Sequence, residues 1–90
     1  CLIKYETEEE AIKIANDTPY GLAGYVQGEQ AHAVEVASKI RAGQVTINKG
    51  ARVRSAPFGG YGSSGNGREH GTHGLEECLE TKAVIGALVE

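Results

Sequence analysis

The sequence predicts an α/β fold, in the form of part of an open parallel sheet with crossover helices. Short apolar segments alternate with helical segments of about ten or more residues, in the order strand, helix, strand, helix, strand. Strands separated in this way need crossover connections and therefore run parallel. With 90 residues, of which 40% are apolar and 23% charged, the chain is typical of one soluble globular unit.

The first two expected elements are a short strand and a capped helix. Residues 2–5 alternate weakly in polarity and suit a strand. Thr7, followed three residues later by Glu10, forms a capping box, and the acidic residues of that first turn suit the positive end of the helix dipole. The helix should end before Pro19, because proline disfavours helical geometry in the residue that precedes it.

The central elements are a strand, a helix and a second strand. Residues 22–26 form an apolar run bounded by glycines, which favours a buried strand. Residues 29–41 carry apolar side chains at helical spacing, and Gly43 stands where a C-terminal cap belongs. Residues 44–48 are rich in β-branched side chains and suit the second strand.

The last part of the chain holds a long loop and two shorter elements. The loop runs from Lys49 to about Arg68, and connections of this length in compact domains are usually functional or disordered. Its proline and aromatic residues favour an ordered loop that packs against the protein. A short helix is expected within residues 69–77, and residues 78–89 suit a final strand.

Composition excludes several classes of partner. The net charge is −3 and the basic residues are scattered, so we expect no nucleic-acid partner. No apolar run has the length of a membrane span, and no segment resembles a signal peptide, so we expect a cytoplasmic protein without a membrane partner. Cys1 and Cys78 lie far apart, which favours two reduced cysteines over a disulfide. The chain has no methionine and opens on an apparent strand, which indicates a piece of a longer protein.

A glycine pattern of the dinucleotide-binding type, G-x-G-x-x-G, spans Gly60 to Gly65. In a true fingerprint the glycines directly follow a strand and open a helix. Here the preceding strand ends near Asn48, and Asn66-Gly67 follows, so the context does not fit phosphate binding. The favoured alternative is a turn that places Phe58 and the adjacent charges of Arg68 and Glu69.

The histidines give no reason to expect a metal. His70 and His73 are three residues apart, but structural zinc sites need about four ligands and no further Cys or His lies nearby in sequence. His32, on the second expected helix, is most simply a solvated residue.

Four motifs occur together and in order: A-N-x-x-x-Y-G-L from Ala15, V-x-x-N ending at Asn48, P-F-G-G-Y from Pro57, and S-G-x-G-R-E-x-G from Ser64. They resemble the C-terminal part of the NAD(P)-dependent aldehyde dehydrogenase superfamily, over residues 5–84. The resemblance implies that residues 1–78 belong to the catalytic domain. Residues 79–90 would form an oligomerisation strand that joins a neighbouring subunit in a homodimer or homotetramer.

The resemblance implies an enzyme that oxidises an aldehyde to a carboxylic acid with NAD or NADP. In the family a Cys thiolate attacks the carbonyl, hydride passes to the nicotinamide, and a water activated by Glu hydrolyses the thioester. The nucleophile, the general base, the oxyanion Asn and the cofactor site lie upstream of the matching segment. Neither Cys1 nor Cys78 is then catalytic, and the chain alone should be inactive. Two alternatives are an inert module that self-associates through the terminal strand and a phosphate-binding module built on the glycine loop.

The resemblance also implies roles for individual residues, each with a structural alternative. Phe58 resembles the aromatic that walls the aldehyde pocket, or is a core side chain. Asn48 resembles an Asn near the active site, or caps a turn. Glu69 resembles a carboxylate that supports proton relay behind the general base, or is purely structural. Arg68 would pair with Glu80, within or between subunits.

The loop glycines are expected to shape the turn around these residues. The structural members of the loop are then Pro57, Gly59, Gly60, Gly65 and Gly67. The family commonly has Lys after P-F-G-G-Y, whereas here the residue is Gly62. This departure removes a cation and creates the G-x-G-x-x-G string.

Overall fold

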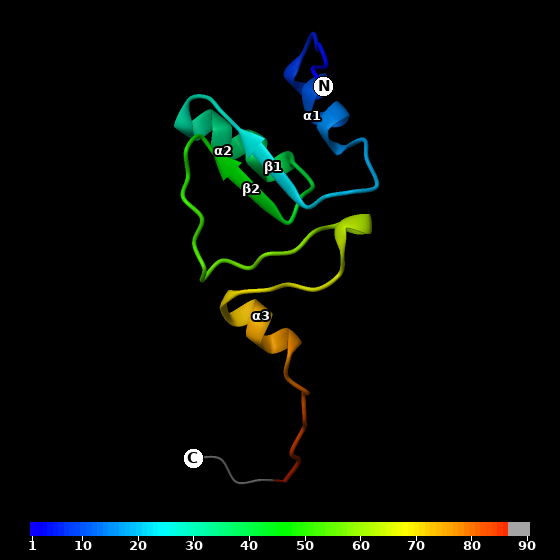
Figure 1. Ribbon diagram of the computed structural model, residues 1–90, viewed down its shortest axis with the longest axis vertical. Helices are drawn as coiled ribbons and strands as arrows, with labels where there is room; N and C mark the ends of the chain where they lie inside the picture. The colour runs from blue at the N-terminus through cyan, green and yellow to red at the C-terminus, as the bar shows by residue number, and fades with distance from the viewer. Residues whose placement is uncertain (87–90) are drawn as a thin grey trace.

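A computed structural model of the chain, described over residues 1–86, has two parallel strands joined by a helix (Figure 1). The strands pair from Ala23 opposite Gln44 to Val26 opposite Ile47. This confirms the predicted α/β class with a crossover helix between parallel strands. The elements in order are α1 (Glu8–Asn16), β1 (Ala23–Val26), α2 (Gln30–Lys39), β2 (Gln44–Ile47), the 3-10 turn η1 (Gly62–Ser64) and α3 (Gly71–Glu77).

The start of α1 confirms Thr7 as the N-cap, but the return bond of the predicted capping box goes to a different residue. The Thr7 hydroxyl accepts a hydrogen bond of 3.2 Å from the Glu10 N–H. The Glu10 carboxylate in turn accepts one of 2.9 Å from the N–H of Glu6. The Thr7 bond satisfies one N–H group that the first helical turn would leave unpaired, whereas the Glu10 carboxylate binds the residue before the N-cap and not Thr7 itself. The helix ends at Asn16, before Pro19, as the sequence predicts.

Two sequence-based expectations need correction. Residues 2–5 form no strand, because no other segment of the described chain runs beside them to supply hydrogen bonds. Gly43 does not cap α2, which ends at Lys39 and has Ile40 as its C-cap in an extended conformation. Gly43 is instead required by close packing: a Cβ on Gly43 would lie 1.6 Å from the carbonyl oxygen of Gly59.

The predicted final strand lies partly outside the described residues. Residues 79–86 contain no strand, and residues 87–90 are outside the described part. A strand needs a hydrogen-bonded neighbour, and the expected neighbour of this segment belongs to another subunit. The oligomerisation strand over residues 79–90 therefore stays a prediction.

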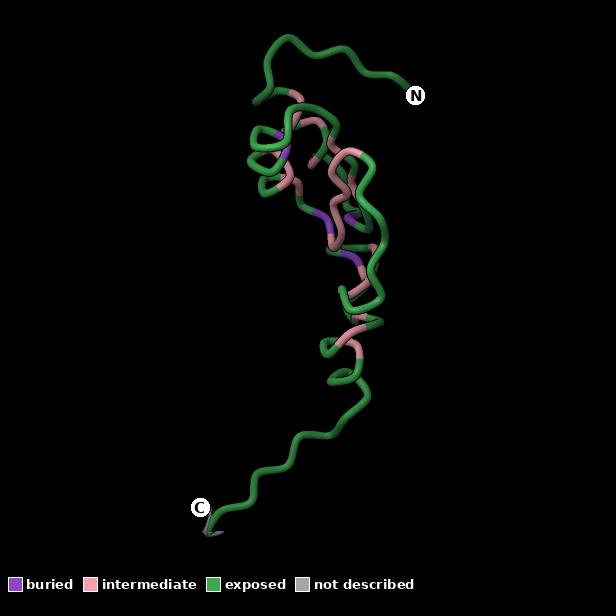
Figure 2. Tube along the Cα trace, turned by 90° about the vertical axis from the view of Figure 1, so that its left-hand side faces the viewer, coloured by how far each residue is buried: buried purple, intermediate pink, exposed green. Residues whose placement is uncertain are grey.

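The described chain buries little apolar surface. Among residues 1–86 the buried apolar side chains are Ala33 and Ala42, whereas Tyr25 on β1 is 77% exposed. The radius of gyration is 17.7 Å, against about 12 Å for a compact domain of this length. Figure 2 shows the buried residues confined to the middle of an elongated molecule whose two ends are exposed. The faces of the sheet thus lack a full cover within this chain.

Candidate functional site

The long loop closes on itself through an isolated antiparallel bridge between Phe58 and Glu69. The Phe58 N–H donates to the Glu69 carbonyl at 2.7 Å, and the Glu69 N–H donates to the Phe58 carbonyl at 2.6 Å. The two ends of the glycine-rich stretch are therefore held together. The bridge fixes the backbone of the two residues to which the sequence assigns a role in the site.

The glycine-rich stretch is also tied to the segment that precedes β1. The Tyr61 N–H donates to the Gly21 carbonyl at 2.8 Å, and the Ser63 N–H donates to the Pro19 carbonyl at 2.7 Å. The Ser64 hydroxyl accepts from the Gly21 N–H at 2.9 Å. These contacts join the A-N-x-x-x-Y-G-L motif to the P-F-G-G-Y and S-G-x-G-R-E-x-G motifs, about forty residues further along the chain.

The N–H groups of the G-x-G-x-x-G string are largely used within the chain. Besides Tyr61 and Ser63, the Ser64 N–H donates to the Tyr61 carbonyl at 3.1 Å and the Gly65 N–H donates to the Gly62 carbonyl at 3.3 Å. A phosphate cradle presents such N–H groups to its ligand at the start of a helix. Here the string ends in a three-residue 3-10 turn, so its geometry does not fit phosphate binding.

Several loop glycines lie where no side chain fits. A Cβ on Gly59 would lie 2.2 Å from the Gly67 carbonyl oxygen, and one on Gly60 would lie 2.4 Å from the Ser64 Cβ. Gly62 has φ 54°, and a Cβ there would lie 2.5 Å from the Pro19 carbonyl oxygen. A side chain at this position, such as the Lys that the resemblance implies, would therefore require a different loop path.

Arg68 holds the loop through backbone contacts. Its Nη1 donates to the carbonyl oxygens of Gly60 at 3.0 Å and of Gly67 at 2.9 Å. Its guanidinium also lies 5.6 Å from the centre of the Tyr61 ring. Within residues 1–86 Arg68 makes no ion pair with Glu80. A pair between subunits stays a prediction.

Asn48 lies in the turn that follows β2. Its φ is 53°, a left-handed value that asparagine tolerates better than most residues. Its Oδ1 accepts from the Gly28 N–H at 3.0 Å, and its Nδ2 donates to the Gln30 Oε1 at 3.2 Å. The side chain thus ties the end of β2 to the β1–α2 connection. These contacts fit the turn-capping alternative.

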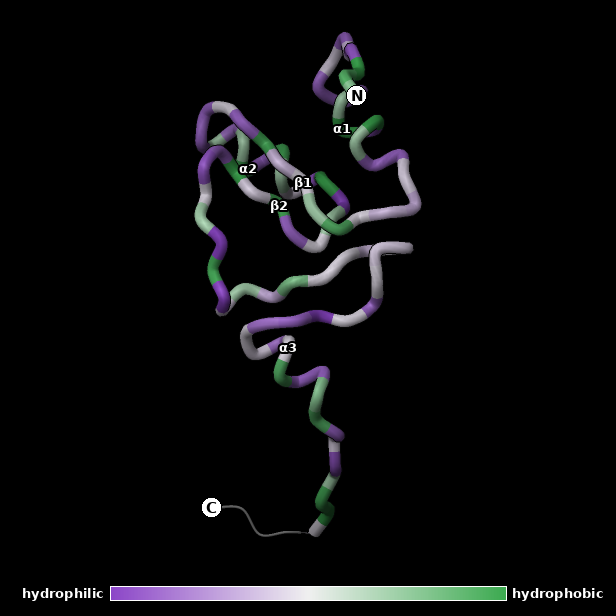
Figure 3. The backbone as a smooth tube through the Cα atoms, in the orientation of Figure 1, coloured by the Kyte–Doolittle hydropathy of each residue, from purple (hydrophilic) through white to green (hydrophobic). Residues whose placement is uncertain are grey.

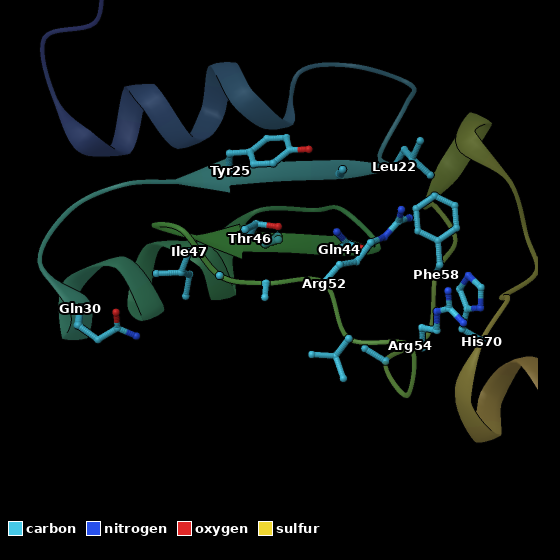
Figure 4. Close-up of a pocket in the computed structure, with 16 residues that line it drawn as sticks. Leu22, Tyr25, Gln30, Gln44, Thr46, Ile47, Arg52, Arg54, Phe58 and His70 are labelled. Atoms are coloured by element: carbon cyan, nitrogen blue, oxygen red, sulfur yellow. The ribbon is translucent and has the colours of Figure 1, made fainter.

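Phe58 borders a broad surface hollow beside the two strands, which we call the sheet hollow (Figure 4). It has a volume of about 1190 Å³ and is lined by β1, β2, the start of the long loop, Phe58 and His70. Phe58 is half-buried, and the guanidinium of Arg52 stands 4.8 Å from its ring centre. Phe58 therefore borders open space next to the sheet in this chain, and both of its expected roles, pocket wall and core side chain, stay predictions.

Glu69 contributes its backbone to the bridge, while its side chain is free in the described chain. The residue is exposed, and its carboxylate makes no hydrogen bond or ion pair with residues 1–86. The structure therefore assigns it no structural ion pair, and the relay role stays a prediction.

Two polar side chains with a structural role were missed at the sequence level. The Asn16 Nδ2 donates to the Lys39 carbonyl at 2.9 Å, and its Oδ1 accepts from the Arg41 N–H at 2.8 Å, so Asn16 fixes the end of α2. His32 is not simply solvated, because its Nε2 contacts the Glu8 carboxylate and joins α2 to α1. The A-N-x-x-x-Y-G-L motif was the available signal for Asn16.

Glu29 caps the start of α2 and gives a prediction on pH. Its carboxylate accepts from the N–H groups of His32 and Ala31, which lowers the pKa of Glu29. The pKa of Glu29 is thus lower in the folded protein than in the unfolded chain, where it is near 4.5. The stabilisation of α2 by this cap is therefore complete above pH 4.5. It is lost as the pH falls through the folded pKa. We expect an NMR titration to show the Glu29 carboxyl titrating below its unfolded value. A Glu29→Gln variant should lack this pH dependence, and a Glu29 midpoint at or above 4.5 would contradict the account.

Residues 1–86 contain no disulfide and no cluster of side chains that could bind a metal ion. Cys1 and Cys78 are free and exposed. No group of three or more His, Cys, Asp or Glu side chains comes together within residues 1–86. In the same part of the chain, no helix combines the length and apolar character that crossing a membrane requires.

The chain belongs to the aldehyde dehydrogenase family, whose model matches residues 1–84. A 3-succinoylsemialdehyde-pyridine dehydrogenase of a Pseudomonas species is 54% identical over 87 residues, which are 96% of this chain and 18% of the relative. The resemblance to the C-terminal part of this family is thus confirmed, and the chain spans about a fifth of the length of such relatives.

Solved structures show the same fold. An aldehyde dehydrogenase of Pseudomonas syringae, in complex with NAD+ and octanal, superposes with a TM-score of 0.92 at 58% identity, over 100% of this chain and 19% of that one. An aldehyde dehydrogenase of Mycobacterium tuberculosis, in complex with NAD+, superposes with a TM-score of 0.83 at 43% identity. The match covers 94% of this chain and 18% of that one. The α/β arrangement described above is therefore that of a piece of this family's fold.

Proposed function

We propose that this chain forms the end of the catalytic domain, residues 1–78, of an enzyme that oxidises an aldehyde to a carboxylic acid with NAD or NADP. The observation that carries the proposal is the family match over residues 1–84. The Pseudomonas syringae relative, solved with NAD+ and octanal, supports both the cofactor class and the substrate class. Unpaired cysteines support a reducing, cytoplasmic location.

The residues of this chain do not fit the dinucleotide. Most N–H groups of the G-x-G-x-x-G string, those of Tyr61, Ser63, Ser64 and Gly65, donate to carbonyl oxygens of the chain itself and so are not available to a pyrophosphate. We therefore assign the cofactor site to the part of the enzyme outside this chain. When bound, the cofactor would accept the hydride of the aldehyde.

Residues 1–86 also show no nucleophile hydrogen-bonded to a base. Within the described residues, the thiol of Cys78 makes a 3.6 Å hydrogen bond to the Gly74 carbonyl and none to a basic side chain. An activated thiol needs a base or a positive charge within reach. The 90-residue chain should therefore form no NADH or NADPH from an aldehyde. Aldehyde-dependent reduction of either cofactor by the chain alone would contradict this assignment.

Phe58 is proposed to wall the aldehyde pocket, with Glu69 supporting proton relay. A hybrid enzyme tests the role of Phe58: this chain replaces the matching segment of the Pseudomonas syringae enzyme. Phe58→Ala should lower kcat/KM for octanal about tenfold, because an apolar pocket contact is worth about 1–3 kcal/mol. Tyr20→Ala, at an exposed position before β1 and outside the sheet hollow, is the control for loss of an aromatic side chain. An unchanged kcat/KM in Phe58→Ala would contradict the role.

The second candidate function is an inert module that self-associates through its C-terminal end. The observation that favours it is the exposure of three apolar residues after α3: Leu79, Val84 and Ile85. Figure 3 shows hydrophobic and hydrophilic colour alternating along this part of the trace. An unpaired apolar strand associates with other strands. The same segment would join subunits in the homodimer or homotetramer that we propose for the enzyme. Size-exclusion chromatography with and without residues 82–90 tests this, and an unchanged apparent mass would contradict it.

A further inference from the structure

The sheet hollow carries positive charge at the end where Phe58 lies. Arg52, Arg54 and His70 line the hollow together with Phe58, and Figure 4 draws all four at the same end. The Arg52 guanidinium lies 4.8 Å from the Phe58 ring centre. The His70 ring lies 6.5 Å from the same centre. Three side chains that are cationic or can become so therefore surround the proposed pocket wall.

No acidic side chain of the described chain balances this charge within the hollow. The sequence has 12 acidic against 9 basic residues, yet none of the residues that line the hollow is Asp or Glu. The ion pairs within residues 1–86 use Lys4, Lys39 and His32, and leave Arg52 and Arg54 without an acidic partner. The hollow is thus electropositive in a chain whose net charge is negative.

The two guanidinium groups of the sheet hollow favour a carboxylate ligand. Guanidinium groups present planar pairs of N–H donors that match the two oxygens of a carboxylate. The contact with the Phe58 ring holds Arg52 beside the aromatic side chain. The hollow therefore combines an aromatic surface for a hydrocarbon segment with donors for an anion.

We propose that the aldehyde oxidised by this enzyme carries a carboxylate at the end remote from its carbonyl group, and that Arg52 and Arg54 bind that carboxylate. The inference rests on the proposed function, because it takes Phe58 as the wall of the aldehyde pocket. The hydrocarbon segment of the substrate packs on Phe58, and its far carboxylate accepts hydrogen bonds from the two guanidinium groups. The substrate class is the oxo carboxylic acids.

The hybrid enzyme tests this with pairs of equal chain length: 4-oxobutanoate against butanal, and 6-oxohexanoate against hexanal. We expect kcat/KM to be about tenfold or more higher for each oxo acid, since hydrogen bonds to charged groups are stronger than neutral ones. Added salt should reduce that preference. Arg52→Gln and Arg54→Gln should each lower the ratio of the two kcat/KM values about tenfold, with partial recovery in Arg52→Lys.

The control variant is Arg41→Gln, whose guanidinium lies 6.0 Å from the Tyr61 ring and outside the sheet hollow. It should leave the ratio unchanged. If the hybrid oxidises aldehydes but shows no preference for oxo acids, or if Arg52→Gln leaves the preference intact, the inference is wrong and the proposed function stands.

A hybrid that oxidises none of these compounds contradicts the proposed function. Calorimetric binding of succinate and butyrate to the hybrid then decides the inference separately, because the two acids differ by the far carboxylate. Tighter binding of succinate that is lost in Arg52→Gln supports the anion site. Equal binding of both acids overturns it.

Discussion

Replacing Gly43 with alanine should strongly destabilise the protein, because the surrounding backbone leaves no room for a side chain. The new Cβ would lie 1.6 Å from the Gly59 carbonyl oxygen and 2.7 Å from the Gly59 carbonyl carbon. Both are backbone atoms, so the clash is relieved only by moving the loop that carries Phe58. Overpacking usually costs about 1–3 kcal/mol, and a backbone clash of this depth should cost about 3 kcal/mol or more.

The measurement is the apparent melting temperature of the hybrid enzyme. About 3 kcal/mol lowers this temperature by about 6–12 °C in a domain of about 150–250 residues, and the fall should be smaller, a few degrees, in the longer hybrid. Gly28→Ala is the matched control, because a Cβ on Gly28 would have no atom within 4 Å. It should change stability by less than about 1 kcal/mol. Equal melting temperatures for Gly43→Ala and Gly28→Ala would contradict the close packing of Gly43 on Gly59.

Replacing Asn48 with alanine should cost about 2 kcal/mol, from two causes. Alanine at φ 53° would be in the left-handed region, which destabilises the folded state by about 1–2 kcal/mol. The hydrogen bonds to Gly28 and Gln30 are also lost, at a net cost of about 0.5–1.5 kcal/mol each for typical bonds. Both hydrogen bonds are exposed, so water can replace them in the variant. The total loss of stability should therefore lie near the lower end of the summed costs.

Asn48→Gly separates the two causes, because glycine accepts the backbone angle and lacks the side chain. Its melting temperature should lie between those of Asn48→Ala and the unsubstituted hybrid. The same variant distinguishes the turn from a pocket role. Under the turn role, kcat/KM for octanal should change less than about tenfold, the effect of a modest pocket contact. A larger loss with an unchanged melting temperature would place Asn48 in contact with the substrate.

The local elements of the fold were predictable because their signals are local. Thr7 and Glu10 specify the start of α1 by themselves, and helical spacing within residues 29–41 specifies α2. The strand expected over residues 2–5 failed because a strand depends on a neighbour that its own sequence does not supply. Gly43 was assigned to the wrong role for a related reason: its position near the end of α2 is visible in sequence, but its contact with Gly59 is not.

The candidate site was predictable only in part. The motifs pointed to Phe58 and Glu69, and the structure joins their backbones in one bridge. The nearness of Arg52 to Phe58 was not predictable, because the path of the loop after β2 follows no regular period. The hydrogen bonds of Asn16 and the contact of His32 with Glu8 likewise depend on tertiary packing.

The central claim is that this chain completes an aldehyde dehydrogenase catalytic domain without supplying the reacting groups. The most direct measurement is octanal-dependent NADH formation by three proteins side by side: the 90-residue chain, the Pseudomonas syringae enzyme without its matching segment, and the hybrid of the two. We predict activity in the hybrid and none in either part alone. Activity in the isolated chain, or an inactive hybrid that is folded, would contradict the claim.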